Sequence, residues 1–155
     1  MPGIDECLLD AMRLPGARGA ALVDWTSGLA LGSVGESPGG DPETAAAEAA
    51  EFARLAAEQR AFAPDDGPDD GPGDGPGDDP GGSPADGCGA DPATAGGPPV
   101  EDLIVSNRDS YHVLRFVGAA FDGEVFLHLW LARPEGNLAL ARIRLAELAR
   151  QLVLI

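Results

Sequence analysis

Residues 19–32 read GAALVDWTSGLALG, two apolar stretches separated by a short polar turn. The stretches Ala17 to Trp25 and Leu29 to Val34 have the length and composition of strands. Between them, Thr26-Ser27-Gly28 supplies residues that are typical of a tight turn. The segment therefore predicts a β-hairpin, from which the fold can be traced in both directions.

Helical periodicity precedes and follows this hairpin. Before it, a short amphipathic pattern ends at Pro15-Gly16, and its apolar positions are Ile4, Cys7, Leu8, Ala11 and Met12. After it, Asp41 and Pro42 begin a second helix, with a capping acid and a proline at the first helical position. This helix is predicted to run to about Phe62. It is rich in alanine, so it should bury a narrow stripe and allow a neighbouring backbone to approach closely.

Three further strands are predicted in the second half of the chain, at Val100 to Val105, Tyr111 to Val117 and Glu124 to Leu131. Turn-forming residues at Asn107 to Ser110 and at Asp122-Gly123 join them as two consecutive hairpins. The last strand is apolar on both faces, so we expect it to lie centrally in the sheet, covered on both sides.

Asn137 can cap a final helix. Its apolar stripe, at spacings of three and four, consists of Leu138, Ala141, Leu145, Leu148, Leu152 and Ile155. The predicted class is therefore α+β, a five-stranded antiparallel sheet with three helices in the order α-β-β-α-β-β-β-α.

Residues 63–99 differ in composition from the rest of the chain. Glycine (11), proline (9) and aspartate (9) make up 29 of these 37 residues, and none is basic or aromatic. Proline at every fourth position from 68 to 84 prevents helices and strand ladders, and little apolar surface is present to offset the entropy of ordering. We expect a disordered insertion in a single domain formed by residues 1–62 and 100–155.

The charge balance excludes several classes of protein. The 155 residues include 26 acids and 10 basic residues, a net charge of -16, but nine of the acids lie in the insertion, which leaves 17 acids against 10 arginines. Nucleic-acid binding is disfavoured because it needs clustered positive charge. The chain has no lysine, which excludes Schiff-base enzymes, Walker-type nucleotide loops and protein kinases.

The ends of the sequence and its cysteines indicate a compartment. Residues 1–10 are acidic and have no basic-then-apolar leader, and no apolar run approaches membrane-spanning length. Cys7 lies on a predicted helix and Cys88 in the insertion, so we interpret both as free thiols. We therefore expect a cytoplasmic protein that does not insert into the membrane.

The residues that could carry chemistry are few. The histidines, His112 and His128, both lie within predicted strands, and neither accompanies a nucleophile in a recognised motif. We interpret His128, which alternates with Phe126 and Trp130, as a packing residue with a satisfied ring nitrogen. Four cysteines and histidines in such separate positions do not predict a zinc site. No enzymatic activity, catalytic residue, metal or cofactor is expected.

The turn of the first hairpin offers a candidate contact. Asp24 and Trp25 at its tip could form a binding spot for a partner. Turn chemistry explains them equally well, because aspartate bonds to nearby amides and tryptophan can close the edge of a core. Both interpretations stay open at this point.

Several motifs together resemble the bacterial roadblock/dynein-light-chain family. They are the hairpin of residues 19–32, the alanine-rich second helix, VEDLIVSNRDSYHVLR at 100–115 and NLALARIRL at 137–145, in that order. The resemblance implies a profilin-like, longin-related fold without enzymatic activity. It also implies a protein that is usually a homodimer and acts as an accessory protein or activator of a small Ras-like GTPase.

The resemblance also suggests an interface. Family members commonly pair through the second helix and the third strand, so that the sheet continues across the two subunits. Carried over by position, the interface residues would be Phe52, Leu55, Ala56, Gln59, Glu101, Leu103 and Val105. A third strand at the sheet edge would leave backbone groups unpaired and available for such pairing.

The chain departs from the family where the insertion joins that helix to that strand. Lengthening a loop from about 5 to about 37 residues costs only roughly 2 kcal/mol, so the fold should tolerate it. A charged segment beside the interface could nevertheless serve as the binding element itself. Two alternatives follow, a dimeric scaffold or adaptor that uses the acidic loop without a GTPase, and a small-molecule sensor. The sequence does not identify the GTPase, its direction of regulation, or whether dimers are homomeric.

Overall fold

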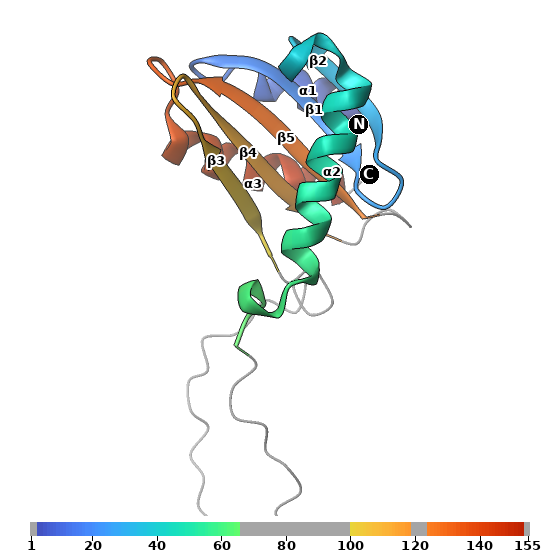
Figure 1. Ribbon diagram of the computed structural model, residues 1–155. Helices are drawn as coiled ribbons and strands as arrows, with labels where there is room; N and C mark the ends of the chain where they lie inside the picture. Colours follow the sequence, from blue (N-terminus) through green and yellow to red (C-terminus); the bar gives the residue numbers. More distant parts are fainter. Residues whose placement is uncertain (1–2, 66–99, 119–123, 154–155) are drawn as a thin grey trace, which may run out of the picture.

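The computed structural model describes residues 3–65, 100–118 and 124–153 (Figure 1). The disordered insertion predicted at 63–99 lies outside the described residues from position 66 onward, and so does the turn predicted at Asp122-Gly123. The segment 66–99 connects the second helix to the third strand along the chain, as the sequence predicts.

A five-stranded antiparallel sheet forms the centre of the molecule. Its strands are β1 (Ala17–Asp24), β2 (Leu29–Gly35), β3 (Asp102–Ser106), β4 (Ser110–Val117) and β5 (Val125–Ala132). They lie in the order β2-β1-β5-β4-β3, and every neighbouring pair is antiparallel. The predicted α+β class and the central position of the last strand are thus confirmed, and β2 and β3 form the two edges.

Three α-helices cover the sheet: α1 (Ile4–Ala11), α2 (Pro42–Glu58) and α3 (Leu138–Val153). Figure 1 shows α2 crossing one face, with α1 and α3 on the opposite face. Short 3-10 turns precede and follow α2, at Pro38–Gly40 and Arg60–Phe62. The arrangement is a three-layer one, with helices on both sides of one sheet.

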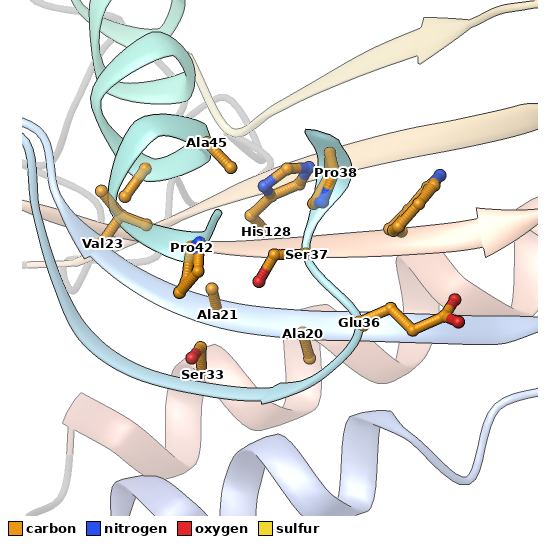
Figure 2. A pocket seen from close by; sticks show the side chains of 13 residues that line it. Ala20, Ala21, Val23, Ser33, Glu36, Ser37, Pro38, Pro42, Ala45 and His128 are labelled. Atoms are coloured by element: carbon orange, nitrogen blue, oxygen red, sulfur yellow. The ribbon is translucent and has the colours of Figure 1, made fainter. Parts of the chain in front are cut away.

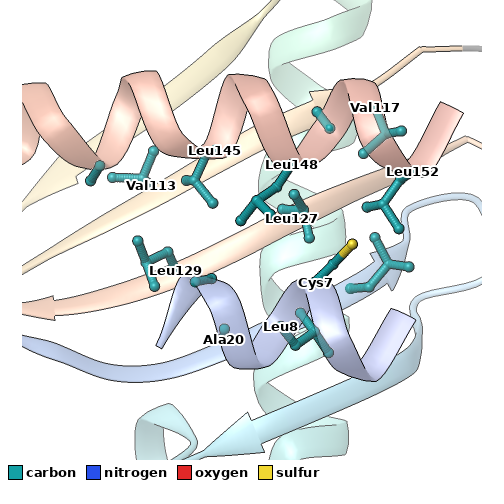
Figure 3. Close-up of a cluster of buried hydrophobic side chains, with 14 of the residues drawn as sticks. Cys7, Leu8, Ala20, Val113, Val117, Leu127, Leu129, Leu145, Leu148 and Leu152 are labelled. Carbon is teal, nitrogen blue, oxygen red and sulfur yellow. The ribbon is translucent and has the colours of Figure 1, made fainter. Parts of the chain in front are cut away.

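The two faces of the sheet have different cores. Leucines dominate under α1 and α3, where Leu127 and Leu129 of β5 meet Leu145 and Leu148 of α3 (Figure 3). The core under α2 is smaller and contains Phe126, Leu114 and Val23 together with alanines of the helix. Because alanine has so short a side chain, α2 lies close to the sheet, as its composition predicts.

The helix caps agree with the sequence, but one helix end does not. The Asp41 carboxylate accepts a hydrogen bond from the Glu43 amide, and the Asn137 side chain accepts one from the Leu140 amide. The prediction that the second helix runs to about Phe62 is wrong, because α2 ends at Glu58 and Gln59 has an extended conformation. Phe62 is 64% exposed, so a further turn would gain no packing against the sheet.

Strand boundaries differ from the predicted ones by at most two residues, the largest change being the start of β3 at Asp102 instead of Val100.

Cys7 is a free, buried thiol of α1, as expected, whereas Cys88 lies outside the described residues. In the parts of the chain that the structure describes, no helix is long and apolar enough to cross a membrane.

Candidate functional site

An apolar surface is exposed on the outer side of α2. The helix buries one stripe of alanines against the sheet, made up of Ala46, Ala50, Ala53 and Ala56. Phe52 and Leu55 lie off this stripe and are 43% and 58% exposed. Exposure of two large apolar side chains on one helix costs solvation free energy that a binding partner would recover.

The strand β3 adds a second apolar element. Among the described strands it pairs only with β4, so its other edge has unpaired backbone groups, in agreement with the predicted edge position. Leu103 packs against the core under α2, and Val105 is 37% exposed. Phe52 and Val105 line the same hollow between α2 and the sheet. We call Phe52, Leu55, Leu103 and Val105 the α2–β3 surface.

The other three interface candidates differ in how far they are exposed. Ala56 belongs to the buried stripe and is only 8% exposed, so it offers little area to a partner. Gln59 is exposed at the C-terminal end of α2. Glu101 is exposed just before β3, and its carboxylate lies 3.8 Å from the Arg115 guanidinium. None of the seven assignments is tested by these contacts, and they stay predictions.

The hairpin tip is built largely from internal contacts. The Asp24 carboxylate accepts hydrogen bonds from the Thr26 amide at 2.9 Å and the Thr26 hydroxyl at 2.6 Å, which lower the pKa of this carboxyl. The Trp25 ring packs edge-on against Phe116, with 6.1 Å between ring centroids. These are the contacts expected if Asp24 and Trp25 stabilise the turn itself. Trp25 also accepts a hydrogen bond at its carbonyl from Arg54, which ties the hairpin to α2.

A row of polar and aromatic side chains crosses the sheet on the α2 side. His112 Nδ1 and His128 Nε2 are 2.9 Å apart, within hydrogen-bonding distance. The His112 ring stacks on Trp130 with an interplanar angle of 11°, and the Arg18 guanidinium lies 3.7 Å from the centre of the Trp130 ring. Arg18 in turn binds Glu36 at 3.1 Å. The satisfied nitrogen expected of His128 is found, and its partner is the other histidine.

Both histidines are held in the neutral form near neutral pH. Burial, followed by the effect of neighbouring His112, lowers the pKa of His128 to about 4. Burial also lowers the pKa of His112, with a further contribution from Arg18 that Asp109 opposes. Figure 2 shows the His128 ring beside Ala45 of α2 and Pro38 of the preceding turn. The pair thus lies where the start of α2 meets the sheet.

Sequence reasoning did not place these two histidines together. A hairpin turning at Asp122-Gly123 would set His112 opposite Arg133, but the register of β4 and β5 sets it opposite Trp130. Leu114 lies opposite His128, so the two imidazoles are diagonal neighbours on one face. The sequence did indicate that each strand of one predicted hairpin carries a histidine. It did not indicate the register that makes the two histidines neighbours.

The order of the strands, with one helix on one face and two on the other, defines the fold. This is a roadblock fold of the longin-related type. No known family model matches the sequence, and no curated protein is detectably similar to it in sequence.

Solved structures of MglB and MglC, which are roadblock/longin-fold proteins, have this fold. MglB from Myxococcus xanthus is 15% identical over 95% of this chain and 79% of its own, with a TM-score of 0.59. An MglB structure with a tetrameric arrangement is 17% identical over 96% of this chain and 84% of its own, with a TM-score of 0.61. MglC from Myxococcus xanthus is 17% identical over 96% and 95%, with a TM-score of 0.52. The likeness is one of fold, and it confirms the architecture that the sequence motifs imply.

Proposed function

We propose that this chain is a non-catalytic accessory protein of the roadblock type, which forms a homodimer and binds or regulates a small Ras-like GTPase in the cytoplasm. The observation that supports this most directly is the α2–β3 surface on a roadblock fold. It combines exposed apolar side chains with an unpaired strand edge, the two elements that roadblock proteins commonly use for pairing.

The size of the surface supports the use of both elements. A stable interface needs about 800 Å² from each partner, which is more than two side chains of a helix can supply. The edge of β3 would add main-chain hydrogen bonds, while Phe52 and Leu55 would supply apolar area. One MglB structure has a tetrameric arrangement, which also supports self-association as a property to test in this chain.

The dimer is tested by charge substitution on the surface. We expect Leu55→Glu to weaken self-association by at least about tenfold, because a buried unpaired carboxylate is costly. Sedimentation equilibrium of the full-length protein measures this change. Leu29→Glu is the matched control, because Leu29 is 64% exposed on the opposite edge strand β2. A wild-type protein that is monomeric at high concentration would refute the dimer.

The GTPase is tested with small Ras-like GTPases encoded in the same genome, starting with any encoded nearby. We expect co-purification and a changed rate of GTP hydrolysis, both reduced by Leu55→Glu and unaffected by Leu29→Glu. A dimer that binds none of these GTPases would favour the scaffold instead. In that case deletion of residues 63–99 should abolish binding of the scaffold's partner.

A further inference from the structure

A hollow of about 210 Å³ lies between α2 and strands β3 to β5. Its lining is apolar apart from three side chains, which are His112 of β4, His128 of β5 and Glu48 of α2. Two imidazoles and one carboxylate are an unusual polar set for an otherwise apolar hollow. They are also the ligand types that zinc, nickel and copper ions bind in proteins.

The two imidazoles have the spacing of ligands to one ion. His112 Nδ1 and His128 Nε2 are 2.9 Å apart. Two nitrogens bound to one ion at about 2.05 Å are separated by about 2.9 Å at a right angle and about 3.3 Å at a tetrahedral angle. The two nitrogens would therefore separate by no more than about 0.5 Å, and both rings would also have to turn, because their facing nitrogens now point at each other and not at a common ion.

Metal binding would also change the position of a hydrogen in the pair. In the hydrogen-bonded pair, one facing nitrogen carries a hydrogen and the other a lone pair. Metal binding needs a lone pair on each, so that hydrogen moves to the other nitrogen of its own ring, and the net charge of the pair is unchanged.

We propose that His112 and His128 form a binding site for a divalent transition-metal ion, with Glu48 and water completing the coordination. Within the described residues no group of three or more histidine, cysteine, aspartate or glutamate side chains is arranged so that it could hold a metal ion as it stands. Glu48 is an exposed residue of α2, so its side chain has to turn towards the imidazoles when the ion binds. The site would be of the two-histidine, one-carboxylate type, which leaves positions open for water.

The position of the site gives it a regulatory consequence. Phe52 and Val105 of the α2–β3 surface line the same hollow. An ion held by β4, β5 and α2 would fix the helix against the sheet beside that surface. This consequence rests on the proposed function, but metal binding itself does not, because all three ligands belong to one chain.

Binding is tested by calorimetric titration of untagged, chelator-treated full-length protein with Zn²⁺ and Ni²⁺ near neutral pH. Excess Mg²⁺ is included to occupy carboxylate-only sites, since the chain has 26 acidic residues. We expect one ion per chain, with a dissociation constant in the micromolar range or below. His112→Asn should weaken binding by at least about tenfold and Glu48→Gln by less, whereas Glu51→Gln, on the same helix, should have no effect.

A second measurement avoids substitutions altogether. The chain contains only two histidines, so its imidazole NMR signals are readily assigned. Zn²⁺ should shift both sets of signals at one equivalent, and Cu²⁺ should give an electron paramagnetic resonance spectrum with coupling to two nitrogens. Binding that is absent, that survives His112→Asn unchanged, or that moves neither imidazole would overturn the proposal. A stable dimer without metal binding would refute this site and leave the proposed function intact.

Discussion

Replacement of a buried alanine of α2 by leucine should separate the helix from the sheet. Ala50 and Ala53 are 0% exposed, and both belong to the core under α2 with Phe126 and Leu114. In Ala50→Leu, three additional carbon atoms must enter a space that alanine already fills. The facing side chains must repack or the helix must move away from the strands, because the core under α2 is already filled.

The expected magnitude follows from this overpacking. Extra methylene groups in a well-packed core cost about 1–3 kcal/mol, even when the new residue is a good helix former. Ala47→Leu is the matched control, because Ala47 lies on the same helix with an exposed side chain and should change stability by less than about 0.5 kcal/mol. For a domain of this size the two variants should differ in melting temperature by about 4–12 °C.

Urea unfolding followed by tryptophan fluorescence measures the free energies, with thermal unfolding as a second readout. Trp25 contacts Phe116 at the edge of this core, so its emission reports the packing under α2. Self-association of Ala50→Leu should also weaken, because displacement of the helix moves Phe52 and Leu55. Equal stability of Ala50→Leu and Ala47→Leu would refute the idea that small side chains hold α2 close to the sheet.

Three further predictions concern the histidine pair, a strand end and a helix cap. Because the pKa of His128 falls to about 4 in the folded protein against 6.5 unfolded, the unfolded state binds more protons between these values, and stability should fall as pH falls through this window. His128 alone should contribute a loss on the order of 1 kcal/mol between pH 7.5 and 5.5, and the urea midpoints of His128→Gln should lack this pH-dependent loss. Gly35→Ala should cost at least about 1 kcal/mol more than Gly39→Ala in the same assay, because both have positive φ but only at Gly35 would the new methyl group meet the Arg18 carbonyl, at 2.6 Å. Asn137→Ala should cost about 1 kcal/mol by removing the bond to the Leu140 amide, and Asn137→Asp should restore most of it in thermal unfolding.

The elements of this fold were predictable because their signals are local. Alternation of apolar residues, the Asp41 cap and the stripe of the final helix each depend on residues a few positions apart. The end of α2 was not predictable in this way. Arg60 to Phe62 continue a helix-compatible sequence, but there Phe62 points to solvent, and helices of this length depend on packing for stability.

The candidate surface was only partly predictable. The exposure of Phe52 and Leu55 follows from helical periodicity once the alanine stripe is buried. The rotation of α2 about its own axis decides that Ala56 belongs to this buried stripe and that Leu55 is exposed. Rotation is set by contacts with Leu114, Phe116 and Phe126, which come from distant parts of the chain.

The sequence by itself determined the element order, the central position of the last strand, and the concentration of acid, glycine and proline in residues 63–99. Only the tertiary structure decided that His112 and His128 meet, that Trp130 and Arg18 extend their row, and that the hollow beside them also holds Glu48. The physical reason is strand register. A shift of one residue turns every side chain to the other face, and register is fixed by packing of the whole sheet rather than by any one turn.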